Sequence, residues 1–325
     1  MTVVGAGPAG SAAAISARLA GAGVSIFEKS QLPRHKVCGE FFSPEAEPLL
    51  EQLGAWPAFF DAKPYVIRQL ELHFPRATKL AKLPEPAYGL TRYRFDRLLL
   101  GRALAVGASF ERAPAPAEPM PPVVMAAGRR FEGKRGGRLF GFKAHFTGPQ
   151  SDSVALYFFD HCYVGVNCAE DGLTNVCGLG PEEALARHGF APDSLLATFA
   201  ALRERVAPLH RSMDWLVTGP LYFRNRLDAP PAPGHYYAGD QLSFVDPFTG
   251  TGMLSALISG SAAGLAAATG QDPAAYLKTI TQKLRPALRV SSVFRWAIET
   301  GWADRFVNWI PADLLVGWTR PKLGS

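Results

Sequence analysis

The first 28 residues place the strongest constraint on the fold. A short apolar segment, Thr2–Val4, is followed at once by the run Gly5-Ala6-Gly7-Pro8-Ala9-Gly10 and then by the alanine-rich stretch Ser11–Ala20. The next apolar segment, Val24–Phe27, ends on Glu28. A G-x-G-x-x-G run between a strand and a helix, with an acid after the second strand, is typical of a β-α-β unit that binds a dinucleotide. We therefore predict a parallel sheet whose first strand begins at Thr2.

Each part of this motif has a physical task. Gly5 permits a tight turn, Gly7 lets the backbone approach a pyrophosphate, and Gly10 lets the helix pack closely on the sheet. Pro8 suits the first helical turn, and the free N–H groups there attract phosphate. Glu28 can accept hydrogen bonds from both hydroxyls of a ribose. An ordinary glycine-rich turn is the plainer alternative. The cofactor contacts predicted in this unit are Gly5, Gly7, Pro8, Ala9, Gly10, Glu28 and Lys29.

A second informative stretch begins where the predicted strand His235–Ala238 ends. An acid at the carboxyl end of a parallel strand faces the ligand crevice, so Asp240 can hold a sugar or ribityl hydroxyl. Gly250 and Gly252 open the helix predicted over Met253–Ala268, whose N-terminus can stabilise negative charge on a reduced ring. A plain glycine and threonine cap is the alternative. The predicted contacts are Gly239, Asp240, Asp246, Pro247, Gly250, Thr251, Gly252 and Met253.

The order of elements predicts an α/β fold with a doubly wound, Rossmann-like domain and a second, inserted sheet. Residues 1–64, 88–130 and 234–270 form the predicted nucleotide domain. The strand-rich residues 65–87 and 131–233 form a mostly antiparallel substrate or lid domain, and 271–325 form a C-terminal helical segment. A helix is predicted from about Pro44 to Leu53 and another over Arg97–Ala105.

Composition excludes several classes of function. The chain has 325 residues and a net charge of +6, but its basic residues are dispersed, which argues against a nucleic-acid partner. Its four cysteines lack metal-ligand spacing, so we expect no metal site and free thiols in a reducing cytosol. Because Thr2 already begins a strand, we expect no signal peptide. The apolar helix around Leu254–Ala268 is too short to span a bilayer. We expect a cytoplasmic protein of undetermined oligomeric state.

These segments together resemble the FAD-dependent oxidoreductases of the hydroxylase-type, glutathione-reductase-like second group. The resemblance rests on Gly5–Glu28, on Pro33-Arg34-His35-Lys36-Val37-Cys38-Gly39-Glu40, on Arg92 with Phe95-Asp96, and on Gly239–Gly252. Geranylgeranyl reductases, flavin halogenases and flavin monooxygenases are the members it resembles most. The resemblance implies FAD as the cofactor, with NADH or NADPH as a transient electron donor. It adds Arg34, Cys38, Gly39 and Arg92 to the predicted cofactor contacts.

The chain departs from these relatives at three places. Ala127-Gly128 stands where hydroxylases carry Asp-Gly, and Asn308-Trp309-Ile310-Pro311 is only a fragment of the halogenase W-x-W-x-I-P motif. The stretch Tyr163–Cys168 keeps only the tyrosine of the Y-x-W-x-F-P motif of prenyl reductases. The relatives' substrates therefore cannot be transferred directly.

Three residues are candidates for catalysis. Cys38 corresponds to a cysteine near the flavin in prenyl reductases and can donate a proton to carbon, although a small buried cysteine is the plainer reading. Glu40 is either an acid–base group or a solvated glutamate. His145, on a predicted strand, is the third candidate.

The sequence favours an FAD-dependent oxidoreductase that acts on a small apolar molecule, isoprenoid-like or polyketide-like. Two reactions compete, flavin-mediated reduction of a C=C bond and flavin-hydroperoxide monooxygenation. A flavin-binding electron-transfer or redox-sensing protein is the alternative from another class, and a halogenase-like enzyme without the full halogenase motif is a further one. The β-rich insert favours an enzyme, because electron transfer needs no lid.

The C-terminal tail combines aromatic and basic side chains, which either pack on the domains or hold the protein at a bilayer surface. If they contact a bilayer, the full chain will float with anionic vesicles at low salt and a Trp309→Ala/Trp318→Ala variant will not. Failure of both to float would leave the tail as a packing element. The side chains concerned are Phe294, Arg295, Trp296, Trp302, Arg305, Phe306, Trp309, Trp318, Arg320 and Lys322.

Overall fold

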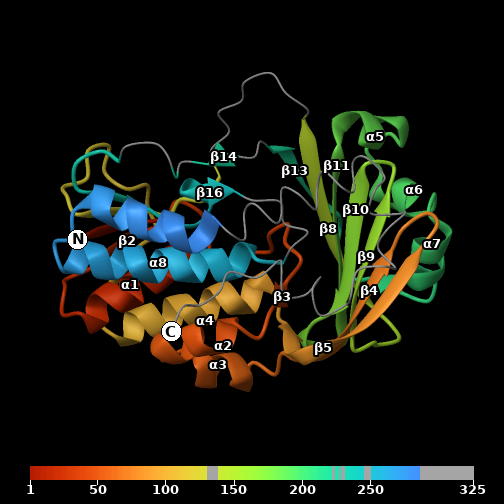
Figure 1. Ribbon diagram of the computed structural model, residues 1–325, viewed down its shortest axis with the longest axis horizontal. Coiled ribbons are helices and arrows are strands. Elements are labelled where there is room, and N and C mark those ends of the chain that lie inside the picture. Colours follow the sequence, from red (N-terminus) through yellow and green to blue (C-terminus); the bar gives the residue numbers. More distant parts are fainter. Residues whose placement is uncertain (130–137, 222–223, 226, 228–230, 245–249, 286–325) are drawn as a thin grey trace.

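The computed structural model describes residues 1–129, 138–221, 224–225, 227, 231–244 and 250–285. Within these residues two β-sheets stand side by side, a parallel sheet wrapped by long helices and a larger mixed sheet with short helices on its far face (Figure 1). The predicted α/β fold with an inserted second sheet is confirmed. Asp246 and Pro247 lie outside the described residues, as does the aromatic tail from 286 onward.

The parallel sheet has the strand order β15-β7-β1-β2-β6, and every pair in it is parallel. Helix α1 (Pro8–Leu19) follows the first strand directly, as the glycine motif predicts. The order places β1 in the middle, so the glycine loop after β1 lies at the centre of the sheet's carboxyl edge. The strands are β1 (Thr2–Val4), β2 (Ser25–Phe27), β6 (Ser109–Glu111), β7 (Val123–Met125) and β15 (His235–Tyr237).

Helix α8 (Gly252–Ala268) crosses α1 at very short range. A Cβ atom on Gly260 would lie 2.2 Å from the carbonyl oxygen of Ala9, and one on Gly264 would lie 2.1 Å from that of Ala13. The two glycines therefore let the helix backbones touch. None of the described helices is long and apolar enough to cross a membrane.

Further helices belong to this layer; one of the two predicted helices matches its prediction closely, and the other begins earlier than predicted. The helix predicted over Pro44–Leu53 is α2 (Ala46–Gln52), with a separate α3 (Trp56–Asp61) after Gly54. Helix α4 (Arg92–Ala105) begins five residues before the predicted Arg97, because the Thr91 hydroxyl accepts a hydrogen bond from the amide of Arg94 at 3.3 Å and caps the helix there. Residues 273–285 are also helical.

The larger sheet has the order β12-β8-β11-β10-β9-β4-β5-β3, with β13 also paired to β8. It is mixed, because β4 pairs with β9 in parallel while the other pairs are antiparallel. A small third sheet joins β14 (Arg224–Asn225) to β16 (Ser243–Phe244). The strands of the large sheet are β3 (Phe41–Phe42), β4 (Tyr65–His73), β5 (Thr78–Gly89), β8 (Leu139–Thr147), β9 (Ser153–Phe159), β10 (Cys162–Cys168), β11 (Leu173–Pro181), β12 (His210–Arg211) and β13 (Leu216–Leu221).

The two faces of the large sheet differ in chemistry. One face carries apolar side chains such as Phe142, Ala144 and Val176, which pack under α5 (Glu182–Arg187), α6 (Pro192–Leu196) and α7 (Ala200–Val206). Figure 1 shows these helices on the side away from the parallel sheet. On β8 and β11, the residues that alternate with the apolar ones include Lys143, His145 and Asn175, and they face the segment 38–40 on the side of the parallel sheet.

The helix crossing predicts a stability difference between glycines. Gly264→Ala is expected to lower the free energy of unfolding by about 1–3 kcal/mol, because its new methyl group overlaps the Ala13 backbone. Gly101→Ala in α4, whose added Cβ meets no described atom within 4 Å, should instead be neutral or stabilise by up to about 1 kcal/mol. Urea unfolding midpoints of the two variants provide the comparison. Equal effects would show that the α1–α8 crossing is looser than described.

Candidate active site

The glycine loop has the close contacts that its motif predicts. Gly5 has φ of +104°, and a Cβ on Gly10 would lie 1.8 Å from the Gly5 carbonyl oxygen. The Glu28 carboxylate accepts hydrogen bonds from the amide of Ala6 at 3.2 Å and from the amide of Ser30 at 2.9 Å. These bonds hold an acid next to the loop, at the carboxyl end of β2, where the sequence predicts a ribose partner.

A charged cluster lies beside the loop. Asp96 is buried, and it accepts hydrogen bonds from Lys36 Nζ at 2.7 Å and from Arg92 Nε and Nη2 at 2.7 and 2.9 Å. Burial raises the pKa of Asp96, but Arg92 and Lys36 outweigh burial and lower it overall, so the carboxylate is ionised. A Cβ placed on Gly7 would lie 3.8 Å from Lys36 Nζ and 4.0 Å from Arg92 Nη2. Two cations therefore face the glycine loop and suit an anionic ligand.

The sequence predicted Arg92 but missed Lys36 and Asp96 as part of this cluster. Arg34 and Lys29, which were predicted cofactor contacts, are exposed on the loop that precedes it. Burial lowers the pKa of Lys36 most, and the nearby positive charges of Arg92 and Arg34 lower it further.

The second predicted stretch lies beside the same charged cluster. Asp240 lies in the short helix η2 (Gly239–Gln241) just after β15, and its carboxylate is 3.8 Å from Arg129 Nε. Burial raises the pKa of Asp240, and Arg129, Arg92 and Lys36 oppose the shift. Helix α8 lies against η2. A Cβ on its first residue, Gly252, would meet no atom of the described residues within 4 Å.

The remaining predicted residues of this stretch lie around the start of α8. Gly239 adopts φ of +59°, and a Cβ there would be 2.8 Å from the Ala9 methyl carbon. A Cβ on Gly250 would lie 3.0 Å from the Phe41 ring. Thr251 and Met253 are buried beside them.

A buried ion cluster connects two layers of the molecule. One is the parallel sheet with its helices, called the nucleotide layer after its predicted ligand, and the other is the large sheet. Glu40, Lys143 and His145 are almost wholly buried. One Glu40 oxygen pairs with Lys143 Nζ and accepts a hydrogen bond from the Arg92 amide at 2.7 Å. The other lies 2.7 Å from His145 Nε2. Burial raises the pKa of Glu40, but Lys143 and His145 outweigh burial, and the net shift is downward. Glu40 is therefore a buried ionised carboxylate, and the expected alternative of a solvated glutamate was wrong.

The alternation of β-strands explains how this cluster forms. Lys143 and His145 share one face of β8, and their partners on β11 are Cys177 and Asn175. Asn175 Nδ2 donates to the carbonyl oxygens of Cys38 at 3.2 Å and Gly39 at 2.8 Å. Two acceptors fix the orientation of this amide, and among the described residues its buried Oδ1 has no partner. This oxygen is left to accept a hydrogen bond from a ligand.

Cys38 lies between these groups. Its sulfur accepts a hydrogen bond from the Glu40 amide at 3.4 Å and also contacts the Arg92 guanidinium. The structure thus brings together Cys38, Glu40 and His145, the three residues predicted for catalysis. Lys143 and Asn175 were missed, although polar residues alternating with apolar ones in a buried strand were the available signal.

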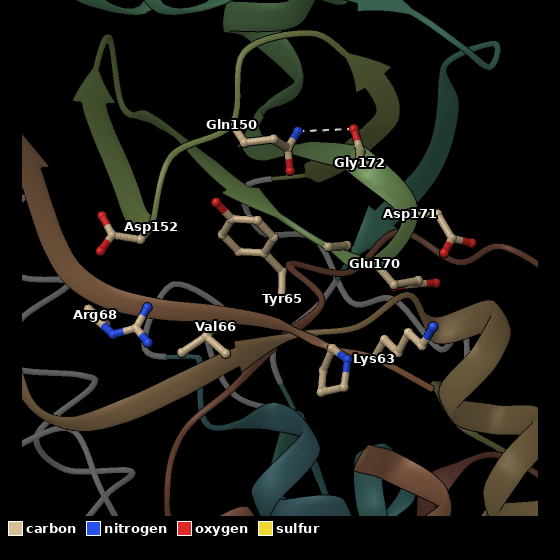
Figure 2. Close-up of a pocket in the computed structure, with 11 residues that line it drawn as sticks. Lys63, Tyr65, Val66, Arg68, Gln150, Asp152, Glu170, Asp171 and Gly172 are labelled. Atoms are coloured by element: carbon tan, nitrogen blue, oxygen red, sulfur yellow. Dashed lines mark hydrogen bonds between the residues drawn. The ribbon is translucent and has the colours of Figure 1, made fainter. Parts of the chain in front are cut away.

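A separate open pocket of about 490 Å³ lies at the edge of the large sheet (Figure 2). Its wall includes Glu170, whose carboxylate accepts a hydrogen bond from the Thr91 amide at 2.8 Å. Gln150 closes another side by donating from Nε2 to the Gly172 carbonyl oxygen at 3.0 Å, as Figure 2 shows. The sequence did not predict this pocket. Through Thr91, its wall touches the beginning of α4, the helix that carries Arg92.

Comparisons with known proteins support the fold more strongly than any single activity. The chain matches the flavin-dependent brominase Bmp2 with a TM-score of 0.80 over 98% of this chain and 92% of that one, at 17% identity. A flavoprotein/dehydrogenase from Cytophaga hutchinsonii gives 0.77, covering 94% and 86% of the two chains at 18% identity. The halogenase CmlS gives 0.74, covering 100% and 68% at 19% identity. The chain has the fold of flavin-dependent halogenases.

Sequence comparison adds a local likeness. A stretch of 54 residues is 50% identical to the menaquinone reductase of Mycolicibacterium smegmatis, and it covers 17% of this chain and 13% of that protein. The menaquinone reductase of Mycobacterium tuberculosis matches to the same extent. No family model matches the chain. The resemblance to FAD-dependent oxidoreductases stated from the motifs therefore agrees with the fold, while the activity is a matter for proposal.

The buried cluster predicts a strong effect on stability. Lys143→Met leaves the Glu40 carboxylate buried without its main countercharge, so the free energy of unfolding should fall by about 3–5 kcal/mol. Lys82→Met, a matched change on exposed β5, should alter it by less than about 0.5 kcal/mol. A Glu40→Gln/Lys143→Met double variant should lose less than the sum of its single changes. Similar urea midpoints for Lys143→Met and Lys82→Met would contradict a buried ion pair.

Proposed function

We propose that the chain is an FAD-dependent oxidoreductase that reduces a small apolar, unsaturated molecule. The observation that carries this proposal is a set of charged and glycine residues gathered at the carboxyl edge of the parallel sheet. The glycine loop, Glu28, two cations and Asp240 lie along this edge, and the buried Glu40 cluster adjoins them through the Arg92 amide. The proposal keeps the predicted division into a discontinuous FAD domain, a substrate or lid domain and a C-terminal segment.

The residues along this edge fit FAD. Glu28 would hold the adenosine ribose, and the loop with Gly7, Lys36 and Arg92 would hold the pyrophosphate. Asp240 would take the ribityl hydroxyls, and the N-terminus of α8 at Gly252, which no other described residue crowds, would receive the ring edge. When bound, the flavin would supply two-electron redox chemistry. The sequence contains no second G-x-G-x-x-G run, so NADH or NADPH would bind only transiently as donor.

The chain's own groups would manage protons and orientation around the substrate. Cys38, the proposed proton donor, lies beside Arg92, and Glu40 and His145 form a buried carboxylate–imidazole pair behind it. The unpartnered Oδ1 of Asn175 would accept a hydrogen bond from the ligand. These positions are consistent with acid–base roles for the three predicted residues.

The local likeness to menaquinone reductase favours reduction and a prenylated, quinone-like substrate. A second candidate, an oxygen-dependent monooxygenase or halogenase, is favoured by the likeness of the whole fold to flavin-dependent halogenases. Both candidates agree with a small organic substrate; fold alone does not choose between them.

One experiment separates the two reactions. The FAD-loaded protein is reduced anaerobically and incubated with a prenylated naphthoquinone, and the extracted lipid is analysed by mass spectrometry. The proposal expects a product with two added hydrogens on the side chain, formed without air and absent with free reduced FAD. A product that forms only when oxygen is admitted, with or without halide, would favour the second candidate.

The cofactor assignment makes its own prediction. Glu28→Lys should weaken FAD binding by at least about 100-fold, because it removes two charged hydrogen bonds to the ribose, each worth about 1.5–3 kcal/mol, and reverses the charge. Flavin fluorescence quenching during titration measures the dissociation constant. Glu85→Lys, the same change at an exposed position of β5, is the control and should leave binding unaltered. Equal affinities for the two variants would refute the ribose role of Glu28.

A further inference from the structure

Residues 37–40 run along β8 and β11, over the polar face of these two strands of the large sheet. Val37 Cγ1 lies 3.0 Å from the position of a Cβ on Gly141, at one end of this crossing. Asn175 holds the carbonyls of Cys38 and Gly39 in the middle, and Glu40 pairs with His145 farther along β8. The segment is therefore fixed in register with the two strands beneath it.

This register places Cys38 over Cys177. Cys177 lies two residues from Asn175 on β11 and thus on the same face. Asn175 donates a hydrogen bond to the Cys38 carbonyl oxygen at 3.2 Å, and Glu40 pairs with Lys143, the β8 partner of Cys177, so Cys38 lies over this part of β11. A disulfide between the two residues requires Cα atoms about 4.4–6.8 Å apart. Both cysteines are free thiols and are neither fully buried nor fully exposed.

The other two cysteines have different surroundings and serve as internal controls. Cys162 is buried near Gly180 at the far end of β10. Cys168 is buried against Thr174 and the amide of Ser151. The register that brings Cys38 to β11 involves neither of them.

We propose that Cys38 and Cys177 are a peroxide-sensitive pair that closes to a disulfide across the candidate active site. The Cys38 sulfur lies beside the Arg92 guanidinium at the candidate active site, and we take Cys38 as the attacking group. Burial raises the pKa of Cys177 to about 12, so this residue stays a thiol until it resolves the intermediate. The proposal does not depend on FAD or on the substrate.

The chemistry takes two steps with hydrogen peroxide as the oxidant. The Cys38 thiolate attacks one peroxide oxygen, an S–O bond forms as the O–O bond breaks, and the departing hydroxide takes a proton to become water. The Cys177 sulfur then attacks the Cys38 sulfenic acid, so that an S–S bond forms, the S–O bond breaks, and the second water leaves with the Cys177 proton. Overall, two thiols and one peroxide give one disulfide and two waters.

The disulfide would alter the site directly. It would draw the Cys38 sulfur away from the Glu40 amide and from Arg92, with which it interacts in the reduced form. The same bond would consume the thiol proposed as proton donor. Oxidation is therefore expected to switch off turnover until a dithiol reductant restores the pair.

Peptide mapping provides a test without any activity assay. Trypsin does not cut the Lys63–Pro64 bond, so Cys38 is the only cysteine in peptide 37–68, while the other three share peptide 144–187. Purified full-length chain is treated with hydrogen peroxide, alkylated, digested without reductant and analysed by mass spectrometry. We expect a cross-link between the two peptides and the loss of about two of the four thiols, both reversed by dithiothreitol.

Variants assign the bond. The cross-link should persist in Cys168→Ala and fall at least about tenfold in Cys177→Ala and in the closer isostere Cys177→Ser, each checked for folding by circular dichroism. A cross-link that survives either Cys177 change in a folded protein would overturn the proposal. Its absence from the peroxide-treated native chain, with Cys38 oxidised singly or unmodified, would overturn it equally.

Discussion

The arrangement of the parallel-sheet layer against the large sheet depends on the ion pair and hydrogen bonds of the buried Glu40 carboxylate. Glu40 accepts a hydrogen bond from the backbone amide of Arg92, the first residue of α4. Its carboxylate also contacts the side chains of Lys143 and His145 on the large sheet. At an effective dielectric constant of 20, two unit charges about 4 Å apart attract by about 4 kcal/mol, and water is excluded from all three side chains. Because an ion left alone in this position would be very costly, the two layers must meet in one register.

The beginning of α4 is held by a second carboxylate as well. Glu170, at the tip of the β10–β11 hairpin, accepts a hydrogen bond from the Thr91 amide, one residue before the bond to Glu40. Both acids lie at the positive end of the helix dipole. The position of Arg92 is thus set jointly by a loop of the nucleotide layer and by the large sheet. Within α4 itself, Asp96 then orients the Arg92 guanidinium toward the glycine loop.

Sequence alone predicted the local features well and the long-range ones poorly. The positions of the glycine loop, Glu28 and Asp240 at the carboxyl edge of the sheet could be predicted because each follows a strand at a fixed place in the motif. Lys143 was missed because its partner Glu40 is distant in sequence, and only strand pairing brings them together. The start of α4 was predicted too late. Its N-cap is Thr91, and the first turn has no acidic residue that would have marked the helix start in the sequence.

Packing alone does not require the polar face of β8 and β11. Replacing a buried ion pair as a whole by apolar side chains of similar volume is often neutral or stabilising, so the cluster is weak support for stability as its purpose. Its members converge on the 38–40 segment, where Asn175 fixes two carbonyls and keeps a buried oxygen without a protein partner among the described residues. An orphaned acceptor and an ionised carboxylate beside a cysteine have a natural use where a ligand completes the hydrogen bonding. Burial of these polar groups costs solvation free energy, and the same groups therefore mark the place at which the large sheet would meet a substrate.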